Sequence, residues 1–266
     1  MKIKMHSVYN HLSNHYPKDN EPYVDCFNDY DCLTGNIPPN SIALLIEPRS
    51  IQPRVYDYME RNYHKFKYVF THDSKLLDMC DNAKLILWGG GSGGIFQYPI
   101  VEKTKNISFV SSDKTMCELH KARLNLAMVL KDSPYIDVMG TFDGGPRVSA
   151  QQIYQDYRFS IAFENYIDDY WFTEKICNCF ANKVIPIYFG ARKIDEFFNM
   201  DGVIRVKDWR DLVVTYNTKI YPSNYEKYYE NCKDAIEDNY RRVQKYATFE
   251  NWFFNEYGEL LDDIHS

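Results

Sequence analysis

The sequence predicts an α/β protein built on parallel sheets. Short apolar runs alternate with amphipathic stretches along almost the whole chain, which is typical of strands joined by crossover helices. The segments 43–46 (Ala-Leu-Leu-Ile) and 184–188 (Val-Ile-Pro-Ile-Tyr) are apolar without interruption, as expected of strands buried on both faces. The chain has 266 residues, of which 45% are hydrophobic, so it can form two small domains or one large one and is too apolar for a disordered segment.

The apolar runs predict eight strands, at 2–7, 41–47, 67–72, 85–88, 106–111, 136–140, 158–164 and 183–189. The amphipathic stretches predict helices at 54–64, 74–80, 114–130, 173–182, 223–246 and 249–264. The last of these carries several large apolar residues, including Trp252, Phe253 and Leu261, on what can be one face. We therefore expect it to pack back on the first domain.

A glycine-rich segment at 89–94 (Gly-Gly-Gly-Ser-Gly-Gly) is the best candidate for a domain junction, because glycine permits positive φ and weakens regular structure. The predicted units are an N-terminal domain (1–103), a second domain (104–247) and a C-terminal helix (248–266). The segment lacks the GxGxxG spacing of a dinucleotide-binding fingerprint. We interpret it as a mobile loop near a cleft, with a plain linker as the alternative.

The composition and charge of the chain indicate which partners it can bind and in which cellular compartment we expect it. The net charge of −6 argues against a nucleic-acid partner, whose backbone is bound by clustered Lys and Arg. No segment approaches the roughly 18 apolar residues of a membrane span, and the first residues lack the apolar core of a signal peptide. We expect a cytoplasmic protein without a transmembrane segment, with peripheral attachment at the inner face of the membrane as the alternative. The seven cysteines are odd in number and lack CxxC spacing, which favours reduced structural thiols.

The most informative motif runs from residue 158 to residue 175, where a strand, a loop and the start of a helix follow one another. Ligands of open parallel sheets bind beyond the carboxyl ends of strands, where helix N-termini receive phosphates. Thr173 is a candidate N-cap, and Lys175 lies in the first turn, where a cation opposes the helix dipole. A bound diphosphate would explain this lysine. Glu174 is favoured there by the dipole, but its carboxylate is also able to accept hydrogen bonds from a ribose or a base.

This motif resembles the donor-binding signature of the alpha-1,3/4-fucosyltransferases, glycosyltransferase family 10. The shared features are Phe-Glu-Asn at 163–165, Thr-Glu-Lys at 173–175, and the strand at 184–187 that leads to Gly190. The resemblance covers residues 106–210 best. It implies a GT-B fold, in which two Rossmann-like domains with parallel sheets face each other across a cleft. It also implies that the second domain (104–247) holds most of a GDP-linked sugar donor, that the first domain (1–103) forms the acceptor side, and that transfer inverts the anomeric carbon.

The resemblance also implies which residues contact the donor. Asn165, Glu174 and Lys175 match the family's donor-contacting positions, with Lys175 on the diphosphate and Glu174 on the nucleoside or the sugar. The family often has Tyr three positions before this glutamate, where this chain has Trp171 beside Tyr170. Both aromatic residues are therefore candidate donor contacts.

A second stretch resembles the family at 109–112, 123–125 and 136–140, where a strand, an arginine-bearing helix and a Val-Asp-x-x-Gly-like strand follow one another. In the family this arginine clamps the pyrophosphate, and a guanidinium suits that role because it can grip phosphate oxygens in a bidentate manner. Arg123 is the corresponding residue. The alternative is a solvated basic helix face that includes His120 and Lys121.

The candidate general base is Glu47, which follows an apolar strand and precedes Pro48. Inverting transfer needs a carboxylate or imidazole that removes the proton of the acceptor hydroxyl. The phrase around Glu47 looks like a counterpart of the family's Gly-Glu-Asn-like phrase, although the Gly and the Asn are missing. A salt bridge to Arg49 or Arg54 is the structural alternative. His72 and Asp73, which end the next predicted strand, are the alternative bases.

The leading interpretation is transfer of fucose from GDP-fucose to a hydroxyl of a glycan acceptor. The alternatives are another nucleotide-sugar donor, a non-glycan acceptor, or a catalytically silent nucleotide-sugar-binding protein. We expect no obligatory cofactor or metal, because Asp168 and Asp169 lack the spacing of a DxD motif; Mg²⁺ or Mn²⁺ would only assist the leaving group. The sequence leaves open the acceptor, the linkage and the oligomeric state.

Overall fold

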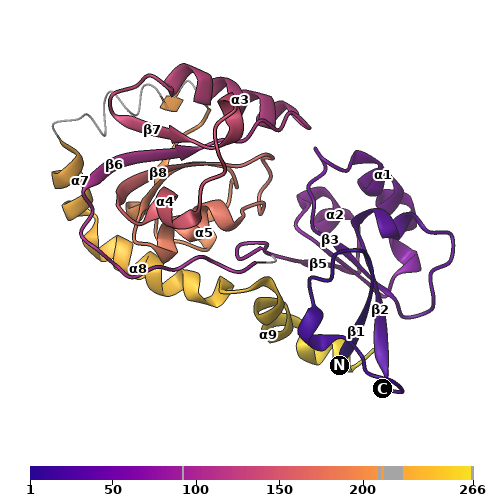
Figure 1. Ribbon diagram of the computed structural model, residues 1–266. Coiled ribbons are helices and arrows are strands. Elements are labelled where there is room, and N and C mark those ends of the chain that lie inside the picture. Colours follow the sequence, from indigo (N-terminus) through magenta and orange to yellow (C-terminus); the bar gives the residue numbers. More distant parts are fainter. Residues whose placement is uncertain (92, 209–210, 213–223, 265–266) are drawn as a thin grey trace.

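The computed structural model describes residues 1–91, 93–208, 211–212 and 224–264 and consists of two lobes, each built on one sheet (Figure 1). The first sheet has the strand order β1-β2-β3-β4-β5 and the second has the order β10-β9-β8-β6-β7. Every strand pairing is parallel. The carboxyl ends of the strands therefore lie along one edge of each sheet.

The first lobe contains β1 (Lys2–His6), β2 (Tyr23–Asn28), β3 (Ile42–Leu45), β4 (Tyr68–Thr71), β5 (Ala83–Leu85), α1 (Pro53–Asn62) and α2 (Ser74–Met79). Strand β2 is missing from the sequence-based prediction, since Asp25 and Asn28 interrupt its apolar pattern. Its alternate residues Val24 and Cys26 are nevertheless buried in the core. Strand β5 also begins and ends earlier than predicted, because β4 pairs with residues 83–85.

Two sets of helices cover the two faces of the first sheet. Helices α1 and α2 cover one face, where Tyr56 and Leu76 join a buried cluster with Leu45 of β3. Helix α9 (Phe249–Asp262) covers the other face, and the Phe253 ring lies 4.9 Å from the Phe70 ring of β4. Helix α9 follows the second lobe in the sequence, but it packs on the first (Figure 1).

The second lobe contains β6 (Lys105–Val110), β7 (Ile136–Met139), β8 (Tyr157–Phe163), β9 (Ile185–Phe189), β10 (Ile204–Arg205), α3 (Glu118–Leu130), α4 (Ala150–Tyr154), α5 (Glu174–Ala181), α7 (Tyr225–Asn231) and α8 (Lys233–Val243). Helices α4 and α5 cover one face of the sheet, and α3 and α7 contribute to the buried cluster on the other. The predicted helix at 223–246 is divided at Cys232, and its first residue lies outside the described part of the chain. No described helix has the length and apolar character needed to cross a bilayer.

The glycine-rich segment is packed, which corrects the expectation of a mobile loop. A Cβ atom at Gly90 would lie 2.1 Å from the main-chain oxygen of Tyr246, and one at Gly94 would lie 2.7 Å from that of Ala247. Main-chain hydrogen bonds also join the segment to the chain between α8 and α9, from the Ile95 nitrogen to the Ala247 oxygen (2.9 Å) and from the Phe249 nitrogen to the Gly91 oxygen (3.4 Å). The glycines therefore allow two crossings of the chain between the lobes to lie side by side.

Candidate functional site

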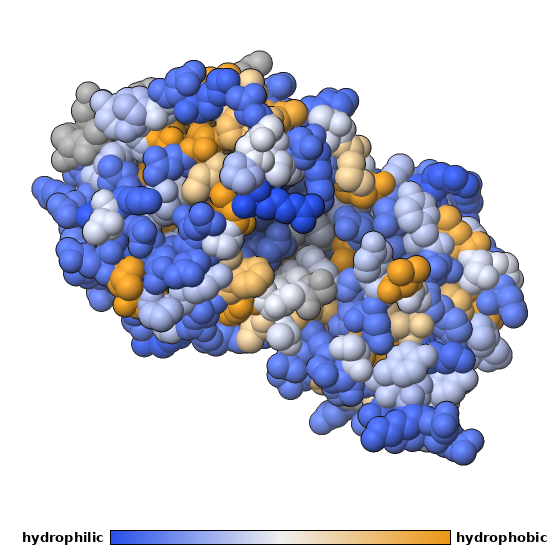
Figure 2. Space-filling view, in the orientation of Figure 1, coloured by the Kyte–Doolittle hydropathy of each residue, from blue (hydrophilic) through white to orange (hydrophobic). Residues whose placement is uncertain are grey.

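A cavity of about 870 Å³ lies between the two lobes, and the surface there is hollowed (Figure 2). Its walls are formed mainly by residues at or just beyond the carboxyl ends of strands from both sheets. The first lobe contributes Tyr9, Asn28, Asp29, Glu47, Gln52 and Trp88, among others, and the second contributes Ser112, Lys114, Arg123, Asn165, Trp171, Thr173, Glu174 and Lys175. The two sheets thus present their binding edges to one cavity.

The strand order of the second sheet contains a switch point, which is where open α/β sheets typically have a ligand site. Strands β7 and β8 follow β6 in sequence but pair on its two opposite sides, so the direction of the connections reverses between β6 and β8. Open α/β sheets bind ligands in the crevice at such a switch point. Ser112 follows β6 and Asn165 follows β8, and both line the cavity.

Lys175 is held at the start of α5 by a buried carboxylate. Its Nζ lies 3.0 Å from Glu164 Oε2 and 2.8 Å from Thr173 Oγ1. Burial opposes the charged amine, but Glu164 and Glu174 raise the pKa of Lys175 above its ordinary value. Thr173 caps the helix, because its side chain accepts from the Lys175 N–H (3.4 Å). The lysine is therefore a fixed cation on the second-lobe wall, and its role in binding a diphosphate stays a prediction. Glu164, which organises it, was not among the predicted site residues.

Arg123 is a second cation on this wall, and it lacks a carboxylate partner within ion-pair distance in the described part of the chain. Its Nη2 donates to Ser112 Oγ (3.4 Å), while its Nε is buried without an acceptor. Burial lowers the pKa of Arg123, and more distant carboxylates only partly oppose this effect. A guanidinium that faces a cavity without a matched anion is typical of an anion-binding site.

Lys114 is a third cation on this wall, although the sequence analysis assigned it no role, and the uncharged ring of His120 also lines the cavity. Burial, together with Arg123, Lys114 and Lys175, lowers the pKa of His120 to about 4, so its ring is neutral at pH 7. Lys114 is exposed and lines the cavity on the loop after β6. Nothing in its local sequence distinguishes it from other surface lysines.

Glu174 lies where the main cavity meets a smaller one of about 250 Å³, and Arg123 and Lys175 line both. The Lys175 Nζ lies 3.6 Å from Glu174 Oε1. Burial opposes ionisation, but this lysine lowers the pKa of Glu174 below its usual value. A ligand held at these cations can therefore extend into both spaces, with the Glu174 carboxylate between them.

The structure separates the two aromatic candidates of the loop before α5. Trp171 is buried, lines the cavity and donates from Nε1 to Asn165 Oδ1 (3.0 Å). The Tyr170 hydroxyl instead accepts from Lys193 Nζ (2.8 Å), and Tyr170 is not part of the cavity wall. Trp171, rather than Tyr170, is thus placed to contact a donor beside Asn165.

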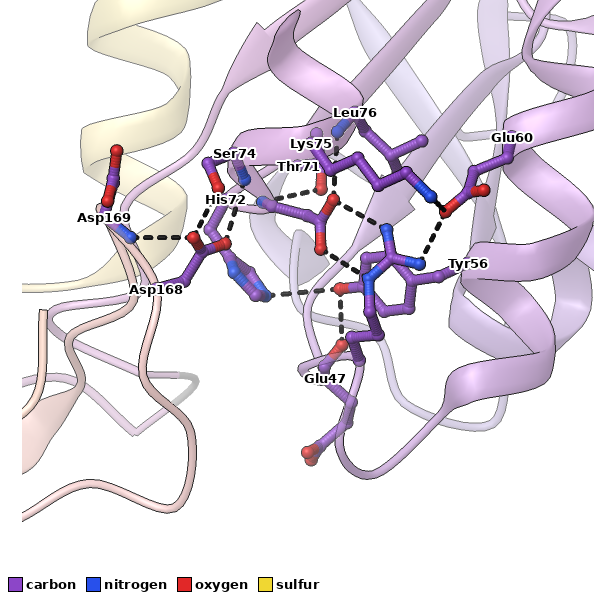
Figure 3. A network of polar contacts seen from close by, with 12 residues as sticks. Glu47, Tyr56, Glu60, Thr71, His72, Ser74, Lys75, Leu76, Asp168 and Asp169 are labelled. Carbon is purple, nitrogen blue, oxygen red and sulfur yellow. Dashed lines mark hydrogen bonds and ion pairs between the residues drawn. The ribbon is translucent and has the colours of Figure 1, made fainter. Parts of the chain in front are cut away.

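Glu47 projects its carboxylate away from the polar network that surrounds its main chain (Figure 3). Its main-chain oxygen accepts from the Tyr56 hydroxyl (2.7 Å), while its carboxylate has no hydrogen bond or ion pair to the described residues. Arg49, the proposed salt-bridge partner, is bound by Asp73 and Glu60 instead. Burial raises the pKa of Glu47, although Lys114 and Lys175 oppose the shift. A raised carboxyl pKa beside a cavity suits general-base chemistry near neutral pH.

His72 and Asp73 do not belong to the described cavity wall. His72 is fully buried between Tyr56 and Trp171, and burial lowers its pKa to about 4. Asp73 accepts two hydrogen bonds from Arg49 and caps α2 through the Leu76 N–H. Asp73 is therefore held by polar partners of the first lobe, and His72 is enclosed between the two lobes.

Asp29, which the sequence analysis did not single out, lies directly beside Glu47. Its carboxylate accepts from the main-chain N–H groups of Ile46 (2.9 Å) and Glu47 (3.2 Å). Its φ of +49° falls in the left-handed region, which is uncommon for residues other than Gly, Asn and Asp. Asp29 tolerates this conformation as an aspartate and is a buried anchor for the loop that carries the candidate base.

Asp168 and Asp169 tie the loop between β8 and α5 to its surroundings. Asp168 is buried and accepts from the Ser74 N–H (2.9 Å) of the first lobe, and Asp169 pairs with Arg192 (3.1 Å). Among the described residues, no group of three or more His, Cys, Asp or Glu side chains is placed to hold a metal ion. The prediction that no metal is required stays a prediction.

Comparisons with known proteins identify the family and the fold of the chain. Residues 100–233 match the model of glycosyltransferase family 10 (fucosyltransferase), C-terminal domain. A crystal structure of an alpha1,3-fucosyltransferase with GDP superposes with a TM-score of 0.54 at 15% identity, covering 96% of this chain and 89% of the other. The structure of an alpha1,3-fucosyltransferase with GDP-fucose gives 0.51 at 14% identity, covering 96% and 82%. No curated protein sequence matches the chain.

A further solved structure, TarM, superposes with a TM-score of 0.58 at 12% identity, covering 90% of this chain and 54% of the other. At such identities the likeness concerns the fold. It confirms the predicted GT-B arrangement of two parallel sheets facing a cleft.

Proposed function

This chain belongs to glycosyltransferase family 10, the fucosyltransferases, and from that premise we propose that it transfers fucose from GDP-fucose to a hydroxyl of a glycan acceptor with inversion at the anomeric carbon. The observation that carries the proposal is the division of charge across the cavity. Arg123, Lys114 and Lys175 lie on the second-lobe wall, and the unpaired carboxylate of Glu47 belongs to the first.

Arg123 and Lys175 are the proposed diphosphate ligands. Arg123 offers a guanidinium without a carboxylate within ion-pair distance in the described part, and Lys175 offers a fixed ammonium at a helix N-terminus. Together they would neutralise the charge that develops on the leaving diphosphate, which is the main electrostatic demand of the reaction. Because side chains can meet this demand, we expect transfer to continue in the presence of EDTA, with Mg²⁺ or Mn²⁺ at most stimulating it.

Asn165, Glu174 and Trp171 are the proposed orienting contacts of the donor. A diphosphate at Arg123 and Lys175 would allow the nucleoside to enter the 250 Å³ cavity and the sugar to enter the larger one, since these residues line both. Glu174 would then accept hydrogen bonds from nucleoside or sugar hydroxyls. The choice of GDP-fucose is supported by two similar solved structures, of an alpha1,3-fucosyltransferase with GDP and with GDP-fucose.

The proposed chemistry is a single displacement. Glu47 accepts the proton of the acceptor hydroxyl as its oxygen bonds to the anomeric carbon, and the bond from that carbon to the diphosphate breaks on the opposite face. GDP leaves with the bonding electron pair, held by Arg123 and Lys175. This proposed geometry is supported by the lining of the cavity, to which the first lobe contributes Glu47 and the second lobe contributes Arg123 and Lys175.

A panel of nucleotide sugars tests the proposal. A ligand that binds only the native state raises the melting temperature according to its concentration and affinity. We expect GDP and GDP-fucose to raise it and UDP, CMP and dTDP sugars to leave it unchanged, with slow hydrolysis of GDP-fucose in the absence of acceptor. A shift with another nucleotide sugar would overturn the donor assignment. Binding of GDP-fucose without hydrolysis or transfer would favour a silent binding protein.

A further inference from the structure

We propose that Asp168 is a positioning residue for the transfer reaction. By binding Ser74, it holds the loop between β8 and α5 against the first lobe. This loop carries Asn165 and Trp171, and the facing part of the first lobe carries Glu47. The inference rests on the proposed function, because it concerns how the proposed donor contacts and the proposed base are held relative to each other. It adds a residue that lies outside the described cavity wall.

The Asp168 carboxylate is buried and receives hydrogen bonds from both lobes. Asp168 is 4% exposed, and its carboxylate accepts from the N–H of Ser74 (2.9 Å) and from the Ser74 hydroxyl (Figure 3). Within the second lobe it accepts from the Asp169 N–H (2.8 Å), and Arg192 Nη1 lies 3.8 Å away. A buried carboxylate is costly unless donors match its lone pairs. Because both Ser74 donors belong to the first lobe, this carboxylate is well satisfied when the two lobes are in contact.

On the first-lobe side, polar contacts continue from Ser74 to the loop that carries Glu47. Asp73, which precedes Ser74, accepts from Arg49 Nε (2.9 Å) and Nη2 (2.8 Å). Arg49 follows Glu47 by two residues. A bidentate pair between arginine and a carboxylate fixes orientation as well as distance. A displacement of Ser74 would therefore also displace the backbone that carries the proposed base.

On the second-lobe side, Asp168 lies midway between two proposed donor contacts. Asn165 precedes it by three residues and Trp171 follows it by three. The first lobe also contacts both of these residues, since the Ser50 hydroxyl donates to the Asn165 main-chain oxygen (3.5 Å) and the His72 ring lies 4.2 Å from the Trp171 ring. Asp168 provides the charged contact of this set, and hydrogen bonds to charged groups contribute more than neutral ones. We therefore assign it the largest share of the positioning.

The arrangement of the lobes should affect the rate of reaction more than the binding of nucleotide. The proposed base belongs to the first lobe and the proposed donor contacts to the second, and a misplacement of about 1 Å can cost about 10²-fold in rate. The diphosphate is proposed to bind Arg123 and Lys175, which both belong to the second lobe. Loss of the Asp168 contact should therefore lower kcat and leave the affinity for GDP nearly unchanged.

Asp168→Asn tests the proposal in the full chain, with release of GDP from GDP-fucose in water as the readout. We expect kcat to fall about 10- to 100-fold, while the Kd of GDP stays within about threefold. Asp169→Asn is the matched control, because it removes the same charge from the same loop but pairs with Arg192 (3.1 Å) and Lys193 (3.6 Å) of the second lobe. Its kcat should stay within about threefold of the unmodified protein.

Three results would overturn the positioning role. The first is an unchanged kcat in Asp168→Asn, and the second is an equal loss in Asp168→Asn and Asp169→Asn. The third is GDP binding that weakens as much as kcat falls, since this would place Asp168 in the donor site instead. Rates are expressed per GDP-binding site, counted by calorimetry, so that unfolded protein does not lower them.

Variants of Ser74 examine the same contact from the first lobe. Ser74→Ala removes the hydroxyl donor and keeps the N–H, so kcat should fall about three- to tenfold, whereas Ser74→Thr keeps both donors and should stay within about twofold. If Asp168 acts through Ser74, the loss in the double variant of Ser74→Ala and Asp168→Asn should be smaller than the product of the separate losses. Independent losses, or an equal loss in the alanine and threonine variants, would overturn the proposal.

The two proposals fail differently. Absence of GDP-fucose binding and hydrolysis in the unmodified protein overturns the proposed function. Normal binding and hydrolysis that Asp168→Asn leaves unchanged would retain that function and overturn only the positioning role.

Discussion

The carboxylate of Asp29 accepts the main-chain N–H of Glu47 at 3.2 Å. Because Tyr56 donates to the main-chain oxygen of the same residue (2.7 Å), the backbone of Glu47 is anchored on both sides. The Glu47 carboxylate has no hydrogen bond or ion pair to the described residues and points away from Tyr56 (Figure 3). The first lobe thus fixes the position of the proposed base without neutralising it, which is the form of support that a precisely placed catalytic group requires.

Asp29→Asn is expected to stabilise the protein more at pH 8 than at pH 4. Burial raises the pKa of Asp29 from 3.8 to about 7, although the N–H groups of Ile46 and Glu47 lower it. The folded state then binds a proton more tightly than the unfolded state, so the native protein loses stability as pH rises from about 4 to about 7. Asparagine removes this loss, which is at most on the order of 4 kcal/mol. Urea unfolding at both pH values measures it, and an equal effect at pH 4 and pH 8 would contradict the prediction.

Glu47→Gln is expected to lower kcat by about 10²- to 10⁴-fold, since it removes a general base, while donor affinity stays the same. In the unmodified protein, transfer should slow as pH falls below the raised pKa of Glu47, and this acidic limb should be absent from the variant. Steady-state kinetics between pH 5 and pH 9 test both points, with Asp57→Asn as the control. Weaker GDP binding in Glu47→Gln would instead indicate a role in the donor site.

Arg123→Met and Lys175→Met are expected to weaken GDP binding by about 10- to 100-fold, because each removes a charge-assisted contact. Their effects on folding should differ. Arg123 lacks a nearby carboxylate in the described part, so its loss should leave the melting temperature unchanged or raise it. Lys175 neutralises the fully buried Glu164, so its loss should cost on the order of 3 kcal/mol. Calorimetric binding and thermal unfolding separate the two, and equal destabilisation by both would contradict this account.

His72→Gln is expected to make the protein less sensitive to acid. Burial lowers the pKa of His72 from 6.5 to about 4, so the unfolded state binds its proton first. The stability of the neutral ring is complete above about pH 6.5 and is lost as pH falls towards 4, amounting to about 3 kcal/mol. The variant should show a smaller loss of unfolding free energy over this window. It should keep kcat within about tenfold; a loss as large as that of Glu47→Gln would make His72 the base.

Gly90→Ala is expected to destabilise the protein by about 2 kcal/mol or more, because its Cβ would overlap the main-chain oxygen of Tyr246. Gly93→Ala is the matched control, since a Cβ there meets nothing within 4 Å and should change stability by about 0.5 kcal/mol or less. Thermal unfolding of both variants tests the packed junction. Equal stability would restore the interpretation of the segment as a loose linker.

Much of the fold could be predicted from the sequence, because most strands are continuous apolar runs and apolar residues recur at helical spacing in most helices. Strand β2 was missed because Asp25 and Asn28 interrupt the pattern, and its burial depends on pairing with β1 and β3. The polar residues at its end, Asn28 and Asp29, consequently carried no signal as site residues. Their position in the cavity could not be predicted, because it depends on contacts between segments that are distant in the sequence.

The second-lobe candidates were better predicted because their motif is local. Asn165, Glu174 and Lys175 lie within eleven residues of one strand–loop–helix unit, and all three line the cavity. The sequence could not decide whether Tyr170 or Trp171 faces the cavity, because adjacent side chains in a loop point in different directions. The roles assigned to these residues stay predictions.

Helix α9 has a consequence for the order in which the protein matures during synthesis. One face of the first sheet is covered by a segment that the ribosome makes after the whole of the second lobe. Multidomain chains commonly fold from the N-terminus as they emerge, but here the earliest sheet keeps an apolar face uncovered until residues 249–262 leave the exit tunnel. The later lobe can therefore close its core first, and a nascent chain halted before residue 249 would be a natural client for chaperones.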